Sequence, residues 1–256
     1  CGCKRNMKKM VYAFRFLTTL PIRWKENENL EDVAKSVSYF PFVGLFIGIL
    51  NAIIFKFLIQ VISAEFASLI TIIWWIIITG GLHLDGIADS ADGLFGGRTP
   101  QKRLDIMKDS RIGTYGVLAV TITLLLKIFL IRELNLINTS QCYNLLIISP
   151  VIGRWNSVFL IFTFKTARKD GLGNFFKQNI TIKNLIFALL FTTITVYLFF
   201  GIPGLATLYI VTIISSFISL FVLNKIGGLT GDIYGSLCEM AEIFALITGL
   251  IWLSLH

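Results

Sequence analysis

Long uninterrupted runs of apolar residues recur along this chain and indicate how it folds. About 20 mainly apolar residues are enough to cross a bilayer as a helix. The pattern predicts seven such spans, at residues 37–62, 67–84, 115–131, 144–164, 185–200, 205–223 and 240–255. A shorter apolar segment, 14–22, precedes them and contains Pro21, which is typical of a segment at the membrane interface. We therefore expect an all-α, polytopic integral membrane helix bundle.

The composition favours a membrane protein over a soluble one with a large core. Of the 256 residues, 55% are hydrophobic, whereas a soluble domain has roughly 45–50% apolar residues. The runs 67–82 and 205–223 contain no charged residue. We expect a single integral membrane domain over residues 1–256. Residues 1–10 are expected to be a poorly ordered terminus or one partly foreign to the native chain.

Basic residues are unevenly distributed among the predicted loops. The N-terminal segment carries eight Lys or Arg, the second and fourth loops carry five each, and the first, third and fifth loops together carry only Arg132. Because basic loops stay on the cytoplasmic side, we expect a cytoplasmic N-terminus in a multi-pass protein of the cell (inner) membrane. The net charge of +8 then reflects contact with anionic membrane lipid. Binding of nucleic acid is not expected, since no basic stripe with interleaved aromatics occurs.

Three aspartates follow the second predicted span. In the sequence LHLDGIADSADGLFGG, a helix would place Asp85, Asp89 and Asp92 within an arc of about 60°. Carboxylates this close repel one another, and Mg²⁺, which binds a few carboxylates together with phosphate oxygens, relieves that repulsion. We predict that the three bind magnesium at the cytoplasmic surface, and that Gly96 and Gly97 allow a ligand to approach closely. A solvated helix end with ordinary charges is the alternative.

The same loop continues as MKDSRIGTYGV. Lys108, Asp109 and Arg111 come immediately before the third predicted span. Cationic side chains beside a metal cluster suit a phosphate-bearing substrate, because they offset its charge. We predict substrate-binding roles for these three residues. Basic charge that only sets the membrane orientation is the alternative.

A third motif, GGLTGDIYGSLCEMAE, leads into the last predicted span. A continuous helix would place Asp232, Glu239 and Glu242 within an arc of about 80°, which indicates a second acidic half of the same site. Ionisable groups inside a membrane are costly and are usually functional or paired. Arg154, in the middle of the fourth span, is therefore either a counter-ion to one of these acids or a substrate contact. His83 is more typical of a packed histidine than of a catalytic one.

These three motifs, together with FLTTLP at 16–21 and YFPFVG at 39–44, resemble the cobalamin synthase family, adenosylcobinamide-GDP ribazoletransferase. The likeness covers essentially the whole chain. It implies a Mg²⁺-dependent transfer that joins adenosylcobinamide-GDP to α-ribazole or its 5'-phosphate and releases GMP. The residues alone predict a metal-assisted phosphotransferase with its site at the cytoplasmic face, and a homo-oligomer is compatible with the sequence. The expected catalytic residues are Asp85, Asp89, Asp92, Asp232, Glu239 and Glu242.

Two other functions are weighed against this one. Metal-dependent CDP-alcohol phosphotransferases have a similar Asp- and Gly-rich motif, but it starts DG-x2-AR. Here Ile87, Ala88 and Asp89 follow Asp85-Gly86, and no arginine is present there. An ion-coupled transporter would use Glu242 and Arg154 as an ion path. However, the acids gather on one side of the membrane, and no paired broken helices indicate inverted repeats.

Overall fold

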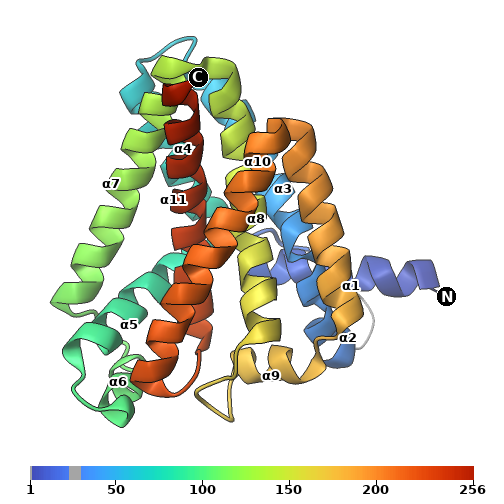
Figure 1. Ribbon diagram of the computed structural model, residues 1–256, viewed down its shortest axis with the longest axis vertical. Coiled ribbons are helices and arrows are strands. Elements are labelled where there is room, and N and C mark those ends of the chain that lie inside the picture. The colour runs from blue at the N-terminus through green and yellow to red at the C-terminus, as the bar shows by residue number, and fades with distance from the viewer. Residues whose placement is uncertain (1, 23–29) are drawn as a thin grey trace.

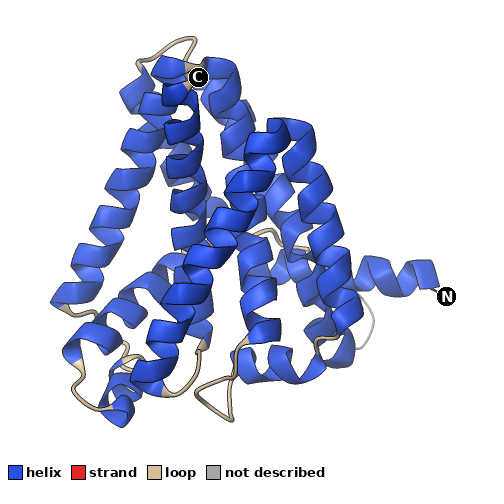
Figure 2. Ribbon diagram, viewed as in Figure 1, coloured by secondary structure: helices blue, strands red, loops and turns tan. Residues whose placement is uncertain are grey.

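The computed structural model describes residues 2–22 and 30–256 of the chain. The long helices form one bundle (Figure 1), and the described residues contain helices and loops with a single isolated β-bridge (Figure 2). The predicted all-α class is confirmed. The elements are α1 (Gly2–Leu17), α2 (Leu30–Lys35), the 3-10 helix η1 (Ser36–Tyr39), α3 (Phe40–Leu58), α4 (Ala64–Thr79), α5 (Leu82–Gly96), α6 (Pro100–Ile106), α7 (Thr114–Ile137), α8 (Thr139–Thr163), α9 (Leu172–Asn179), α10 (Ile182–Ile226) and α11 (Gly231–Leu255).

The core of the bundle includes the contact of α3 with α8. Gly44 and Gly48, about one turn apart on α3, face the backbone of α8. A Cβ at Gly44 would lie 2.8 Å from the Cα of Val151, and one at Gly48 would lie 2.7 Å from the Cα of Ile147. Small residues let membrane helices approach closely enough to gain dispersion contacts. The bundle encloses α8, and 89% of the most apolar 18-residue stretch of this helix is buried.

Within residues 2–22 and 30–256, five helical segments are long and apolar enough to cross a membrane, or up to six if the bent pair of α4 and α5 forms one span. The predicted spans 185–200 and 205–223 both fall in α10, whose 45 residues are interrupted by the non-helical Gly201 and by Pro203. The two legs of α10 run in opposite directions (Figure 1). The chain is therefore a helical membrane protein, and the count of seven spans stays a prediction.

The helix of the predicted span 67–84 stops short of the aspartate motif. α4 ends at Thr79, α5 begins at Leu82, and the two helices meet at 92°. Gly80 and Gly81 between them have φ values of 63° and 67°, a conformation that glycine adopts without the strain of a side chain. The sequence predicts the aspartates at the end of a spanning helix. The structure corrects this, because they lie on a separate helix that turns across the bundle.

The polar loops lie together at one end of the molecule. Loops 97–113, 164–171 and 227–230 are at this end with α6 and α9, and the C-terminus is at the other (Figure 1). The loop after the aspartate motif and the loop before α11 therefore occupy the same end of the molecule. α1 runs across the long helices and brings its last residues, Phe16 and Leu17, to the cavity described below.

Candidate functional site

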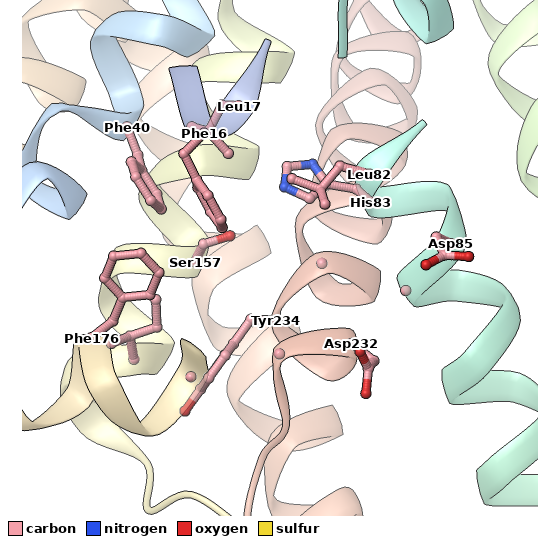
Figure 3. Close-up of a pocket in the computed structure, with 15 residues that line it drawn as sticks. Phe16, Leu17, Phe40, Leu82, His83, Asp85, Ser157, Phe176, Asp232 and Tyr234 are labelled. Atoms are coloured by element: carbon pink, nitrogen blue, oxygen red, sulfur yellow. The ribbon is translucent and has the colours of Figure 1, made fainter. Parts of the chain in front are cut away.

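α5 and α11 come into close contact at Gly86. A Cβ there would lie 2.6 Å from the backbone carbonyl oxygen of Asp232, so the approach requires glycine. Beside this contact, Asp85 of α5 and Asp232 of α11 line the same cavity of ≈ 180 Å³ (Figure 3). The first and third motifs thus contribute side chains to one cavity. That Asp232 shares a catalytic site with the aspartate motif stays a prediction.

The aspartates form an anionic cluster on this side of α5. Asp89 is half-buried and is repelled by Asp85, Asp232 and Asp92, while Arg168 attracts it. Among the described residues, neither Asp85 nor Asp89 has an ion-pair partner. This uncompensated charge fits a hard cation. In residues 2–22 and 30–256, no three His, Cys, Asp or Glu side chains converge on a metal position, but Mg²⁺ commonly uses one or two carboxylates with water and phosphate.

Asp92 has a different environment from the other two aspartates. Its carboxylate is buried and accepts backbone N–H groups at the start of α7, from Gly113 at 2.7 Å and Gly116 at 2.9 Å. Because a helix rises about 1.5 Å per residue, Asp92 also lies about 10 Å along the axis from Asp85. Of the three aspartates predicted to bind metal, Asp92 is therefore engaged by backbone groups of α7, and Asp85 and Asp89 stay the candidate ligands. Asp92 instead holds the N-terminus of α7 against α5.

Arg168 is paired with one of the cavity carboxylates. Its Nη1 lies 3.7 Å from Oδ2 of Asp232, its Nη2 donates to the carbonyl of Leu104 at 2.8 Å, and its buried Nε has no partner among the described groups. A second cavity of ≈ 190 Å³, lined by Arg168, shares Asp232 and two glycines with the first. A guanidinium at this position suits a phosphate group.

A short backbone pairing holds Arg168 in place. Leu229 donates to the carbonyl of Lys165 at 2.9 Å, and Ala167 donates to the carbonyl of Leu229, also at 2.9 Å. Gly228 is required beside this bridge, since a Cβ there would overlap the backbone of Thr166 and Ala167. The loop after α8 is thus fixed against the loop before α11, and this contact joins the arginine to the third motif.

The basic residues of the second motif lie away from both cavities. Arg111 has an 87% exposed side chain and pairs with Asp109 at 2.7 Å, and Lys108 is exposed. The hydrogen bonds from Arg111 lower the pKa of Asp109 to about 2, so this pair stays charged at neutral pH. In this structure the predicted substrate-binding residues Lys108, Asp109 and Arg111 form a solvated loop.

Gly96 and Gly97, also predicted to approach a ligand, lie at the end of α5. A Cβ at Gly97 would lie 2.8 Å from the Cα of Arg103, so this glycine allows α6 to fold back on α5. At Gly96 the nearest atom to such a Cβ, on Ile106, is 3.7 Å away. Neither glycine lines the cavities that contain Asp85 and Asp232. Gly97 therefore has a packing role.

Comparison with known proteins decides the family. A family profile described as "Cobalamin-5-phosphate synthase" matches residues 9–250. The chain belongs to this family. Proteins named adenosylcobinamide-GDP ribazoletransferase are similar over almost their whole length. The one from Desulforamulus reducens is 40% identical over 93% of this chain and 95% of the relative, and that from Caldanaerobacter subterraneus is 36% identical over 94% and 97%. No solved structure matches the chain.

This cobalamin-5-phosphate synthase family enzyme contains a buried charge network beyond the cavity. Lys127 of α7 forms ion pairs with Glu239 and Glu242 of α11, and Arg154 of α8 pairs with Glu242. All four side chains are buried. Two cations balance two anions, as burial requires. Arg154 is therefore a counter-ion, one of the two roles left open by the sequence. The two glutamates, predicted to be catalytic, are paired with these cations inside the bundle. His83 lines the cavity, and its Nδ1 lies 4.0 Å from Glu239.

The sequence did not single out several residues that the structure places at the cavities or in the buried charge network of this enzyme. Lys127 is a single lysine in a predicted apolar span, and that position alone signals a buried partner. Arg168 is one of five basic residues in the fourth loop. All five were attributed to membrane orientation, so none was expected to bind substrate. Phe16 and Phe40 belong to the two N-terminal family signatures and line the cavity. Their sequence gave no sign of that contact because it joins segments far apart in the chain.

Proposed function

We propose that this chain is a Mg²⁺-dependent transferase that joins adenosylcobinamide-GDP to α-ribazole or its 5'-phosphate. The products are adenosylcobalamin or its 5'-phosphate, and GMP. The observation that carries the proposal is the convergence of Asp85, Asp232 and Arg168 on adjoining cavities. It is supported by relatives named adenosylcobinamide-GDP ribazoletransferase that align over more than nine-tenths of this chain.

In this proposal Asp85 and Asp89 would hold the magnesium ion, which when bound supplies Lewis acidity to the pyrophosphate oxygens. Arg168 binds the phosphate that leaves as GMP and offsets its developing charge. A ribose hydroxyl of α-ribazole attacks the phosphorus that remains with the corrinoid, and the bond from that phosphorus to the bridging oxygen breaks.

Asp232 is the acid best placed to accept the hydroxyl proton. A general base must lie within hydrogen-bond reach of the proton it removes, and the side chain of Asp232 lines the cavity. Glu239 and Glu242 are held instead by Lys127 and Arg154. We therefore assign the proton to Asp232, and Thr230, whose hydroxyl donates to its Oδ2 at 3.2 Å, orients this carboxylate.

The same proposal includes the membrane topology. Counting α4 with α5 as one crossing and the legs of α10 as two gives seven crossings. With the basic N-terminal segment in the cytoplasm, the end that carries Asp85 and Arg168 faces the cytoplasm of the cell (inner) membrane. The exposed apolar faces of α7 and α10 then contact lipid.

Purified protein in detergent or liposomes should release GMP from adenosylcobinamide-GDP only when both α-ribazole and Mg²⁺ are present. Removing Mg²⁺ with EDTA is expected to stop the release, and adding Mg²⁺ back should restore it. Chromatography of the nucleotide and corrinoid products measures the reaction. Absence of GMP release from wild-type protein would reject the proposed function, and release of CMP from a CDP-alcohol would favour the other phosphotransferase class.

Arg168→Ala should raise the KM for adenosylcobinamide-GDP by roughly ten- to a hundredfold, since a charged hydrogen bond contributes about 1.5–3 kcal/mol. Arg168→Lys should recover part of the lost affinity, because lysine restores the positive charge but not the bidentate hydrogen bonds of the planar guanidinium. Arg111→Ala serves as the comparison, because Arg111 is exposed and bound to Asp109. A larger effect at Arg111 than at Arg168 would restore the phosphate-binding role predicted from the sequence for the second motif.

A further inference from the structure

The cavity beside Asp85 and Asp232 has an aromatic end that the proposed chemistry does not use. Phe16, Phe40 and Phe176 lie on one side of the cavity, and the two carboxylates lie on the other (Figure 3). The rings of Phe16 and Phe40 stack with centroids 5.7 Å apart, and Phe176 meets Phe16 edge-on at 5.4 Å. These rings come from α1, α3 and α9, so three separate helices build one aromatic wall.

One hydroxyl group that lines this cavity lacks a partner. Tyr234 of α11 lines the cavity with only 5% of its surface exposed, and its hydroxyl has no hydrogen-bond partner among the described residues. A buried hydroxyl left without a partner destabilises the protein until a ligand or water satisfies it. An aromatic cavity with a single unpaired hydroxyl is what a flat, mainly apolar ligand with one acceptor atom would fill.

We propose that this aromatic end binds the benzimidazole base of α-ribazole, an inference that rests on the proposed function. Planar bases stack on the faces and edges of aromatic side chains. The outer edge of benzimidazole is apolar, and its free ring nitrogen can accept the Tyr234 hydroxyl. With the base seated here, the ribose extends toward Asp85 and Asp232, where its hydroxyl meets the phosphate.

The other ring systems of the reaction fit this end less well. Guanine carries amide and amino groups around its edge, and these would lose water without gaining partners against Phe16, Phe40 and Phe176. The corrin ring is far larger than a cavity of ≈ 180 Å³. Size and polarity therefore select the small base of the accepting nucleoside.

Phe16→Leu tests the aromatic wall, and Phe14→Leu is its matched control. Both phenylalanines are half-buried on α1, but Phe14 packs edge-on against Phe46 at 5.3 Å and does not line this cavity. Phe16→Leu should raise the KM for α-ribazole roughly tenfold, with the KM for adenosylcobinamide-GDP changed less than about twofold. Tyr234→Phe, which removes one unpartnered oxygen and leaves the packing intact, should raise the α-ribazole KM about fivefold.

Equilibrium dialysis of labelled α-ribazole against each intact protein gives a second measurement that needs no turnover. The same order of affinity, wild type and Phe14→Leu above Tyr234→Phe and Phe16→Leu, is expected. If wild-type protein releases GMP while Phe16→Leu and Phe14→Leu bind α-ribazole equally, the base site is wrong and the proposed function stands. If the KM for adenosylcobinamide-GDP rises instead, the aromatic wall holds another ring and the proposal is overturned. Loss of GMP release in wild-type protein would reject the function itself.

Discussion

Asp85→Asn and Asp89→Asn should each lower kcat at least about a hundredfold while the protein still folds in the membrane. A hundredfold change corresponds to about 2.7 kcal/mol of transition-state stabilisation, which is within reach of one charged metal ligand. Neither carboxylate has a cationic side-chain partner in the described part of the chain, so neutralising it should not destabilise the fold. Steady-state GMP release at saturating Mg²⁺, with size-exclusion profiles of both variants, measures the effect.

Asp105→Asn is the control for charge alone. Asp105 is exposed on α6, where its carboxylate accepts a hydrogen bond from Gln101 at 2.9 Å, and the rate should stay within about twofold of wild type. Asp92→Asn should behave differently and lower the thermal stability, because an amide offers a single oxygen to the two N–H groups of Gly113 and Gly116. Near-normal rates in both Asp85→Asn and Asp89→Asn would refute the metal assignment.

Lys127→Met should lower the free energy of unfolding by about 3–5 kcal/mol, the usual cost of removing one partner from a buried ion pair. The lysine is the only described cation paired with Glu239 and shares Glu242 with Arg154. Its removal leaves two buried glutamates with one arginine. Thermal unfolding of the detergent-solubilised protein, followed by tryptophan fluorescence, measures the loss.

A second substitution separates lost charge balance from lost packing. Lys127→Met combined with Glu239→Gln removes one charge of each sign, and we expect it to recover at least half of the stability. Lys56→Met, at an exposed position on α3, should change the unfolding temperature little. If Lys127→Met were as stable as Lys56→Met, the ion pairs of α7 with α11 would make no net contribution.

The sequence by itself determined the helical membrane architecture and singled out the motifs of the candidate site. A spanning helix can be predicted from its own residues, because its backbone hydrogen bonds are formed within the helix and its side chains need only be apolar. The aspartate motif and the residues after Gly231 were recognised in the same way, from charge beside apolar runs. The turn at Gly80 and Gly81 was not, since a pair of glycines inside an apolar run does not by itself show that the chain bends.

Only the tertiary structure decided which of the acids lie together. Helical projection places Asp232 and Glu239 on one face, but it ignores a rise of about 1.5 Å per residue. Glu239 therefore lies about 10 Å deeper, beside Lys127, while Asp232 stays at the cavity. The same rise separates Asp92 from Asp85, and Gly113 supplies its hydrogen bond from 21 residues away. Arg168 reaches Asp232 through a bridge between distant loops. A sequence pattern records position along one helix, whereas these contacts depend on how separate helices meet.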